Sequence, residues 1–336
     1  MVGTKSTGPS RREILRTAGF AMGAIVAPGL GLKQARAAGY PERPVKIIVP
    51  FAPAGPTDIM ARILATHLGE ALGGTMVVEN KPGAGGNIGI GAAVHAEPDG
   101  YTLLITSSAY VVNPGLYAKI PYDPYKDFAP IAELGTSPNV ILVGPKLGIN
   151  SIADLIARAK ADPNELNYAS PGIGTTPHLS GELFKIVSGI QITHVPFSGA
   201  GPAIQAILSG TTQVAFAALP PAHPHIESGA LKALAVTGAH RWFDLPDVPT
   251  PVEIGLKDAD STIWFGVFVP AKTPRDIVEK LHAAGEKVLT DPATQASLKK
   301  LGVEPMPMTP AEMDDLVKRE TAANQELIKA AGIKQP

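Results

Sequence analysis

Short runs of apolar residues alternate along the chain with segments of helical periodicity. The first run, Val45 to Val49, is rich in β-branched residues and ends at Pro50. The segment that follows, Thr57 to Leu72, repeats its apolar side chains at the three- and four-residue spacing of a helix. Proline and glycine separate such segments from one another. Strands that alternate with helices predict an α/β fold with a parallel, doubly wound sheet.

The same pattern continues to the end of the chain. Further strands are predicted at residues 76–79, 101–106, 167–169, 191–195, 213–217 and 231–236. Further helices are predicted at residues 87–96, 151–160, 178–187, 202–208, 222–228, 274–289, 292–301 and 310–331.

Two apolar runs flank the middle part of the chain, at Val140 to Val143 and Trp264 to Pro270. They suggest that the chain crosses twice between two α/β lobes, with Trp264 in the core or at a hinge. The predicted lobe 1 comprises residues 38–140 together with 238–336, and lobe 2 comprises residues 141–237. A ligand would then lie in a cleft between the lobes, at the carboxyl ends of strands.

Residues 1–37 resemble an export signal rather than part of the fold. The pair Arg11-Arg12 precedes a weakly apolar stretch at residues 17–32, and Ala35-Arg36-Ala37 suits a signal peptidase that cleaves before Ala38. The arginine pair indicates the twin-arginine route. A membrane anchor is the alternative, but about 16 residues at roughly 1.5 Å each fall short of a ~30 Å hydrocarbon core. We expect a periplasmic protein.

Composition excludes several classes of protein. The 336 residues carry a net charge of -1 and contain no cysteine. Near-neutral charge with no basic block beyond the N-terminus argues against a nucleic-acid partner. A chain without cysteine has no disulfide framework, thiolate metal site, cysteine nucleophile or lipidated cysteine.

Two glycine-rich loops connect a strand to a helix in corresponding places of the two predicted lobes. The free N–H groups of a helix's first turn carry roughly half a positive charge, so such loops can hold an anion without arginine. A plain tight turn is the alternative for the first loop, and Asp58 suits a helix cap better than a ligand contact. Candidate residues in these loops are Phe51, Ala54, Gly55, Pro56, Thr57 and Asp58 in the first, and Ser170, Gly172, Gly174, Thr175, Thr176 and His178 in the second.

Other candidate chemistries have weaker support. His178 and His194 suit structural hydrogen bonding as well as they suit ligand contact, and the spacing of His223 and His225 does not favour a metal site. Phe197 and Ser198 either line the cleft or pack within their own loop. The segment 83–89 has glycines that suggest a dinucleotide loop, but no acidic residue closes a strand at the required distance.

An enzyme is a competing hypothesis, and it needs a nucleophile with a base or a pair of carboxylates. The sequence has no Gly-x-Ser-x-Gly elbow and no acidic pair in the glycine-rich loops. We therefore expect no catalysis, no cofactor and no metal. A sensor subunit that presents its closed lobes to a signalling protein is a further alternative.

Several segments together form a specific pattern over essentially the whole length after residue 38. They are Val49-Pro50-Phe51, Gly55-Pro56-Thr57-Asp58, residues 78–89, residues 98–104, Asn113-Pro114-x-Leu116-Tyr117, Asn167-Tyr168-Ala169-Ser170, His178-Leu179-x-Gly181-Glu182-Leu183-Phe184, His194-Val195-Pro196-Phe197 and Leu234-Ala235-Val236-Thr237. With these segments the chain resembles the Bug family, the receptors of tripartite tricarboxylate transporters.

The resemblance implies a type II periplasmic-binding-protein fold whose two lobes close around a small carboxylate. It also implies that the protein delivers this ligand to integral membrane subunits. A monomer is the simplest expectation. In the family, backbone amides and ordered waters of the two glycine-rich loops hold the carboxylate, and Ser107 and Ser108 are plausible further contacts.

Two positions depart from the family pattern. Ala54 replaces a glycine, and its Cβ restricts how the backbone N–H can turn toward a ligand. Ala217 replaces an aspartate that would pair with an ammonium group. We therefore expect a comparatively apolar pocket that prefers an aliphatic or aromatic mono- or dicarboxylate to an amino acid or a highly hydroxylated acid.

Overall fold

The computed structural model describes residues 2–3, 39–163, 165–256, 261–330 and 332–333. The predicted signal peptide, apart from residues 2 and 3, and its predicted cleavage site lie outside this described part.

Lobe 1 begins with three parallel strands, β1, β2 and β3. Ile47 in the middle of β1 pairs with Val78 of β2 on one side and with Leu103 of β3 on the other. Helices connect these strands because parallel neighbours need a crossover connection. The elements in order are β1 (Val45–Val49), α2 (Pro56–Leu72), β2 (Met76–Asn80), the 3₁₀ turn η1 (Ala84–Gly86), α3 (Asn87–Val94), β3 (Thr102–Ser107) and α4 (Ala109–Leu116).

Lobe 2 repeats this arrangement with a second set of parallel strands. Strand β5 pairs in parallel with β6 and with β7. The elements in order are η2 (Pro145–Leu147), α5 (Ile152–Ala161), β5 (Asn167–Ser170), α6 (Thr176–Ser188), β6 (Thr193–Pro196), α7 (Ala200–Leu208), β7 (Val214–Ala218), α8 (Leu219–Glu227) and β8 (Lys232–Val236).

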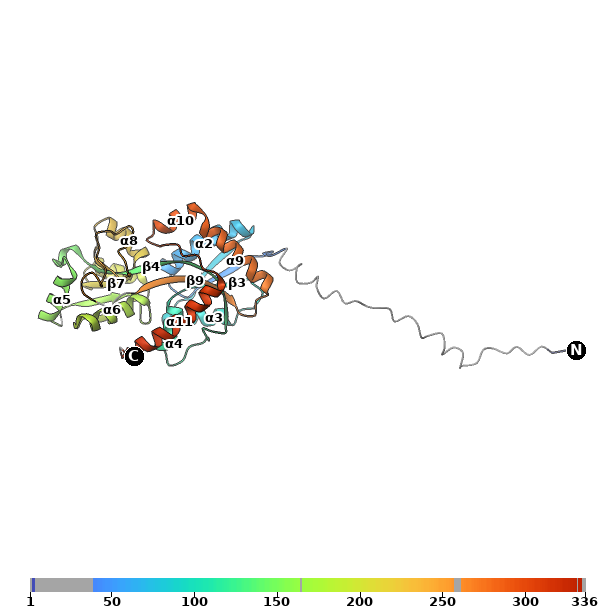
Figure 1. Cartoon of the computed structure of the whole chain (residues 1–336), viewed down its shortest axis with the longest axis horizontal. Helices are drawn as coiled ribbons and strands as arrows, with labels where there is room; N and C mark the ends of the chain where they lie inside the picture. The colour runs from blue at the N-terminus through green and yellow to red at the C-terminus, as the bar shows by residue number, and fades with distance from the viewer. Residues whose placement is uncertain (1, 4–38, 164, 257–260, 331, 334–336) are drawn as a thin grey trace.

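The chain crosses between the lobes twice (Figure 1). Strand β4 (Phe128–Val143) pairs with β9 (Thr262–Pro270) up to Pro138 and with β7 from Asn139 onward, so one continuous strand belongs to both lobes. The second crossing lies between β8 and β9, where the Thr237 amide donates to the Asn139 carbonyl over 2.8 Å. The predicted fold of two α/β lobes joined by two crossing segments is confirmed.

The predicted parallel pairing holds for β1 with β2 and β3 and for β5 with β6 and β7, but not for the strands that pass between the lobes. The strand order is β2-β1-β3-β9-β4-β7-β5-β6, with β8 beside β4, and β4 runs antiparallel to β7, β8 and β9. Antiparallel strands need no crossover helix. The segments that pass between the lobes can therefore enter the sheet directly. The sheet as a result contains both parallel and antiparallel strand pairs.

Helices cover both faces of the lobe 1 sheet. The chain ends in three helices, α9 (Arg275–Thr290), α10 (Pro292–Lys299) and α11 (Pro310–Ala330). Helices α2 and α9 pack on one face, and α3, α4 and α11 pack on the other around Tyr110, Phe268 and Met313. Within the described residues, no helix has the length and apolar character needed to cross a membrane.

Candidate functional site

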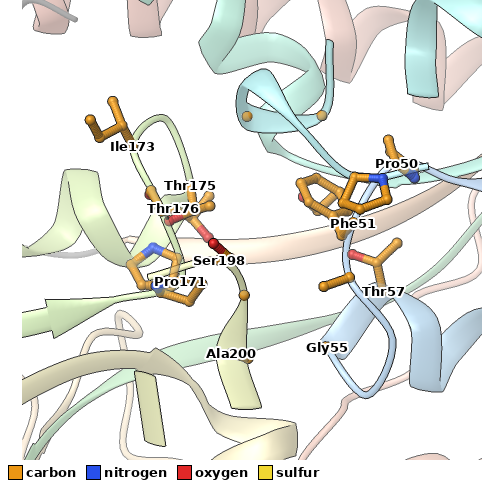
Figure 2. A pocket seen from close by; sticks show the side chains of 18 of the residues that line it. Pro50, Phe51, Gly55, Thr57, Pro171, Ile173, Thr175, Thr176, Ser198 and Ala200 are labelled. Atoms are coloured by element: carbon orange, nitrogen blue, oxygen red, sulfur yellow. Dashed lines mark hydrogen bonds between the residues drawn. The ribbon is translucent and has the colours of Figure 1, made fainter. Parts of the chain in front are cut away.

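A cavity of about 570 Å³ lies between the two lobes. Figure 2 shows Pro50, Phe51, Gly55 and Thr57 of lobe 1 facing residues of lobe 2 across it. The lobe 2 residues labelled there are Pro171, Ile173, Thr175, Thr176, Ser198 and Ala200. Both predicted glycine-rich loops therefore border one shared space.

Ten of the seventeen candidate residues line this cavity. They are Phe51, Gly55, Pro56, Thr57, Ser107, Gly172, Thr175, Thr176, Phe197 and Ser198. The other seven are not among the lining residues; these are Ala54, Asp58, Ser108, Ser170, Gly174, His178 and Ala217.

Some of those seven support the residues that do line the cavity. Ser170 and His178 bond to the amides of the lobe 2 loop. Ser108 precedes α4, and its amide donates to Trp264. Ala217 is buried in β7, and its neighbour Ala218 lines the cavity instead.

Sequence reasoning missed several lining residues. The most informative is the loop Pro82 to Gly86, which the sequence pattern relates to a dinucleotide loop and to the family resemblance but not to ligand contact. Its place after β2 and before α3 matches the place of the other two loops after their strands, and this signal could have assigned it to the site. The lining residues that were not predicted are Pro50, Ala52, Pro82, Gly83, Ala84, Gly85, Gly86, Tyr117, Pro171, Ile173, Pro177, Pro196, Gly199, Ala200, Ala218 and Ile263.

Helix α2 points its first turn at the cavity from lobe 1. Gly55 is the N-cap residue, and Pro56 occupies the first turn, where the missing N–H costs no hydrogen bond. Ala54 just before it has a φ of 59°, and its amide donates to Asp58 Oδ2 over 2.9 Å. The Ala54 amide is thus bonded within its own loop.

The Asp58 side chain holds the lobe 1 loop together through hydrogen bonds. Its carboxylate also accepts hydrogen bonds from Arg62 Nε and Asn80 Nδ2, each over 2.9 Å. Burial alone would raise the pKa of Asp58, but the hydrogen bonds from Arg62, Ala54 and Asn80 outweigh it and hold that pKa below its ordinary value. Asp58 therefore stays charged and fixes the loop.

Replacement of this carboxylate should loosen the loop. We expect Asp58→Ala to lower the free energy of unfolding by about 2 to 3 kcal/mol, because it leaves three donors without their acceptor. Urea unfolding measures this loss. Glu70→Ala, at an exposed position of the same helix, is the matched control and should change little. Equal effects of the two substitutions would contradict a special role for Asp58.

Helices α6 and α7 point their first turns at the cavity from lobe 2. Their N-cap residues are Thr175 and Gly199. The Thr175 hydroxyl donates to the Gly172 carbonyl over 2.7 Å, and Gly199 has no side chain, so neither caps its own helix. The first-turn amides, which have no partner within a helix, remain available to a ligand.

The cavity wall is uncharged. Among the described residues that line it, none is an aspartate, glutamate, lysine, arginine or histidine. Thr176 lines the cavity, and its hydroxyl oxygen is buried without a hydrogen-bond partner within the described residues. A buried hydroxyl without a partner is costly, so a bound ligand that accepts its hydrogen bond would be stabilised. The same part of the chain contains no group of three residues that could hold a metal ion.

The lobes touch each other at both edges of the cavity. On one edge, a Cβ added to Gly199 would lie 2.9 Å from Ala52 Cβ. On the other edge, a Cβ added to Gly85 would lie 3.3 Å from the Ile173 carbonyl oxygen. Only glycine permits these close approaches, so the two lobes meet closely beside the cavity.

Comparison with known proteins gives one consistent family. Residues 60–333 match the model of the tripartite tricarboxylate transporter family receptor. Protein BugT of Bordetella pertussis is 36% identical over 297 residues, which cover 88% of this chain and 91% of BugT.

Solved structures agree with this family. The structure of the periplasmic binding protein BugD has a TM-score of 0.85 and 37% identity, covering 88% of this chain and all of that chain. Rpa4515 of R. palustris, solved with adipate, has a TM-score of 0.85 and 35% identity over the same shares. The family is one of solute-binding receptors rather than enzymes. This chain therefore belongs to the receptor family of the tripartite tricarboxylate transporters.

Proposed function

We propose that this receptor binds a small dicarboxylate with an apolar middle and delivers it to the membrane subunits of its transporter. The observation that carries the proposal is the cavity itself. First turns of helices from both lobes border it, and the described residues of its wall include no charged side chain.

The positions of the helix N-termini favour a ligand with two anionic groups. The first turn of α2 lies in lobe 1, and the first turns of α6 and α7 lie in lobe 2. Each end presents backbone amides and roughly half a positive charge. Because no lining side chain neutralises these partial charges, carboxylates at both ends of a ligand would find complementary partners.

The side chains that line the cavity favour a ligand whose middle part is apolar. Phe51 and Ile263 contribute from lobe 1, and Ile173, Phe197 and Ala218 contribute from lobe 2. Among the described lining residues, no carboxylate is present to pair with an ammonium group. Burial of an unpaired ammonium is costly, so amino acids should bind poorly. The adipate-bound relative is consistent with an unsubstituted aliphatic diacid.

The remaining expectations complete this proposal. The predicted lobe 1 comprises residues 38–140 with 238–336 and the predicted lobe 2 comprises residues 141–237; the transfer of β4 from β9 to β7 at Asn139 supports the first boundary. The second boundary lies further along the chain, because Trp242, Leu245 and Val248 pack in the core of lobe 2. Export to the periplasm follows the twin-arginine route, supported by Arg11-Arg12. The receptor acts as a monomer; this is supported by the cavity, because one chain supplies both of its sides.

A thermal-shift screen followed by calorimetry tests the ligand class. Adipate and neighbouring α,ω-dicarboxylates should stabilise the protein, by about 2.7 kcal/mol when the ligand is at 100 times its Kd. 2-Aminoadipate, the matched control with one added ammonium, should bind at least about tenfold more weakly than adipate. The ligand should be recovered unchanged. Tighter binding of the amino acid, or no stabilisation by any carboxylate, would refute the proposal.

A further inference from the structure

Three aromatic rings, two of them buried and that of His194 half-buried, form a column beside the glycine-rich loop of lobe 2. Tyr168 of β5 stacks on His194 of β6 with ring centroids 4.7 Å apart, and His194 stacks on His178 of α6 at 4.4 Å. None of the three rings is among the residues that line the described cavity. The column therefore lies behind the loop rather than against a ligand.

Each histidine is connected to one amide of that loop. His194 Nε2 lies 2.6 Å from Ser170 Oγ, and Ser170 Oγ accepts a hydrogen bond from the Gly172 amide over 3.2 Å. His178 Nδ1 accepts a hydrogen bond from the Gly174 amide over 3.4 Å. Gly172 itself lines the cavity. The two bonds hold amides on both sides of Ile173.

The acceptor role of His178 requires an uncharged ring, because both nitrogens of a protonated imidazole are donors. Burial lowers the pKa of His178, and burial followed by the charge of His178 lowers the pKa of His194 to about 4. The charged groups that act on the column are Glu182 and Lys185 of α6, which form an ion pair over 2.9 Å.

The far end of the column is also fixed. The Tyr168 hydroxyl donates to Glu182 Oε1 over 2.6 Å, and Lys185 binds the same carboxylate. Glu182 follows His178 by one helical turn on α6. The column is thus held at both ends by one helix, so the rings cannot shift without displacing the loop.

We propose that His178 and His194 are positioning residues, which set the direction of the lobe 2 loop amides and thereby the affinity for the anionic ligand. Neither ring touches the ligand; both act through the loop, His178 on Gly174 directly and His194 on Gly172 through Ser170. The affinity part of this inference rests on the proposed function.

Two nearly isosteric substitutions of His178 separate its acceptor role from its packing. Asparagine can place Oδ1 where Nδ1 lies, whereas leucine cannot accept a hydrogen bond. We expect His178→Asn to bind adipate within about threefold of the wild type and His178→Leu to bind about five- to tenfold more weakly, as loss of one hydrogen bond implies. His240→Asn, at an exposed residue, is the control and should bind as the wild type does. Equal Kd values for the asparagine and leucine variants would overturn the proposal.

A ligand-free measurement decides the proposal even when adipate does not bind. Nitrogen NMR of the wild type at pH 7 should show His178 with an unprotonated Nδ1, and the Gly174 amide should exchange more slowly than in His178→Leu. A protonated Nδ1, or equal exchange of Gly174 in the two proteins, would overturn the positioning role. Failure of every carboxylate to bind would instead refute the proposed function.

Discussion

Gly199→Ala should weaken dicarboxylate binding by about ten- to a hundredfold while the protein still folds. The added Cβ would meet Ala52 Cβ at 2.9 Å, so the lobes cannot reach the arrangement in which they touch at this edge. When the binding-competent arrangement becomes rarer, the apparent affinity falls by the same factor. Calorimetry with adipate measures the change. The substitution should also lower the free energy of unfolding by about 1 to 3 kcal/mol, because Gly199 has a φ of 122°.

Two further variants isolate the contact between the lobes. Gly201→Ala lies in the same first turn of α7, and a Cβ there would meet nothing within 4 Å, so binding should not change. Ala52→Gly combined with Gly199→Ala removes the Cβ–Cβ contact but keeps the backbone strain. The double variant should therefore recover most of the affinity and none of the stability. If it binds as weakly as Gly199→Ala alone, the contact between the lobes does not limit closure.

Glu133→Gln should stabilise the protein by about 2 to 4 kcal/mol near pH 7.5. Glu133 lies in β4, is 1% exposed, and its Oε2 has no hydrogen-bond partner within the described residues. Burial, followed by the charge of Glu320, raises the pKa of Glu133 to about 8. Glu320 of α11 itself accepts a hydrogen bond from Trp264 Nε1 over 2.7 Å, which ties α11 to β9, the neighbour of β4 in the sheet.

Stability falls as the pH rises because the folded chain holds the proton of Glu133 more tightly than the unfolded chain does. Below about pH 4.5 both the folded and the unfolded chain keep Glu133 protonated, so its contribution to stability is fully present. Between pH 4.5 and about 8 the unfolded chain loses this proton and the folded chain keeps it, so stability falls as the pH rises. Glutamine cannot ionise, so Glu133→Gln removes this contribution to the pH dependence of the free energy of unfolding.

Urea unfolding of the wild type and Glu133→Gln across pH 4.5 to 8 measures the effect. The difference between the two proteins should be small at pH 4.5 and should grow with pH; contributions from the histidines cancel in this difference. Glu286→Gln, at an exposed position on α9, should give no pH-dependent difference. A constant difference between the wild type and Glu133→Gln would show that Glu133 does not titrate in this range.

Elements with clear punctuation were predictable from the sequence. Strand β1 has its predicted limits because a β-branched run ends at Pro50, and α2 begins one residue before its predicted start. Two elements were missed. Helix α4 contains Pro114 and Gly115, which argue against a helix, although the structure accommodates them. The first eleven residues of β4 include the buried Glu133 and two prolines, so they lack the apolar pattern of a crossing strand.

The site was predictable as a pair of loops but not as a cavity wall. Strand-to-helix turns rich in glycine identify where the two lobes present their amides, and the structure brings both to one space. Which side chain of a loop faces that space depends on tertiary packing. Asp58 turns back to bond its own loop, and His178 packs on His194. Ala217 and Ala218 alternate across β7, so a one-residue difference decides which of them lines the cavity.

The uncharged wall also has a practical meaning for protein engineering. Main-chain groups, which every sequence possesses, are available to recognise charge, whereas shape is left to a few replaceable side chains such as Phe51, Phe197 and Ile263. Exchanging those side chains should retune the scaffold toward bulkier or slimmer diacids without rebuilding its anion recognition. This separation of charge recognition from shape recognition makes the chain a suitable starting point for engineered carboxylate sensors.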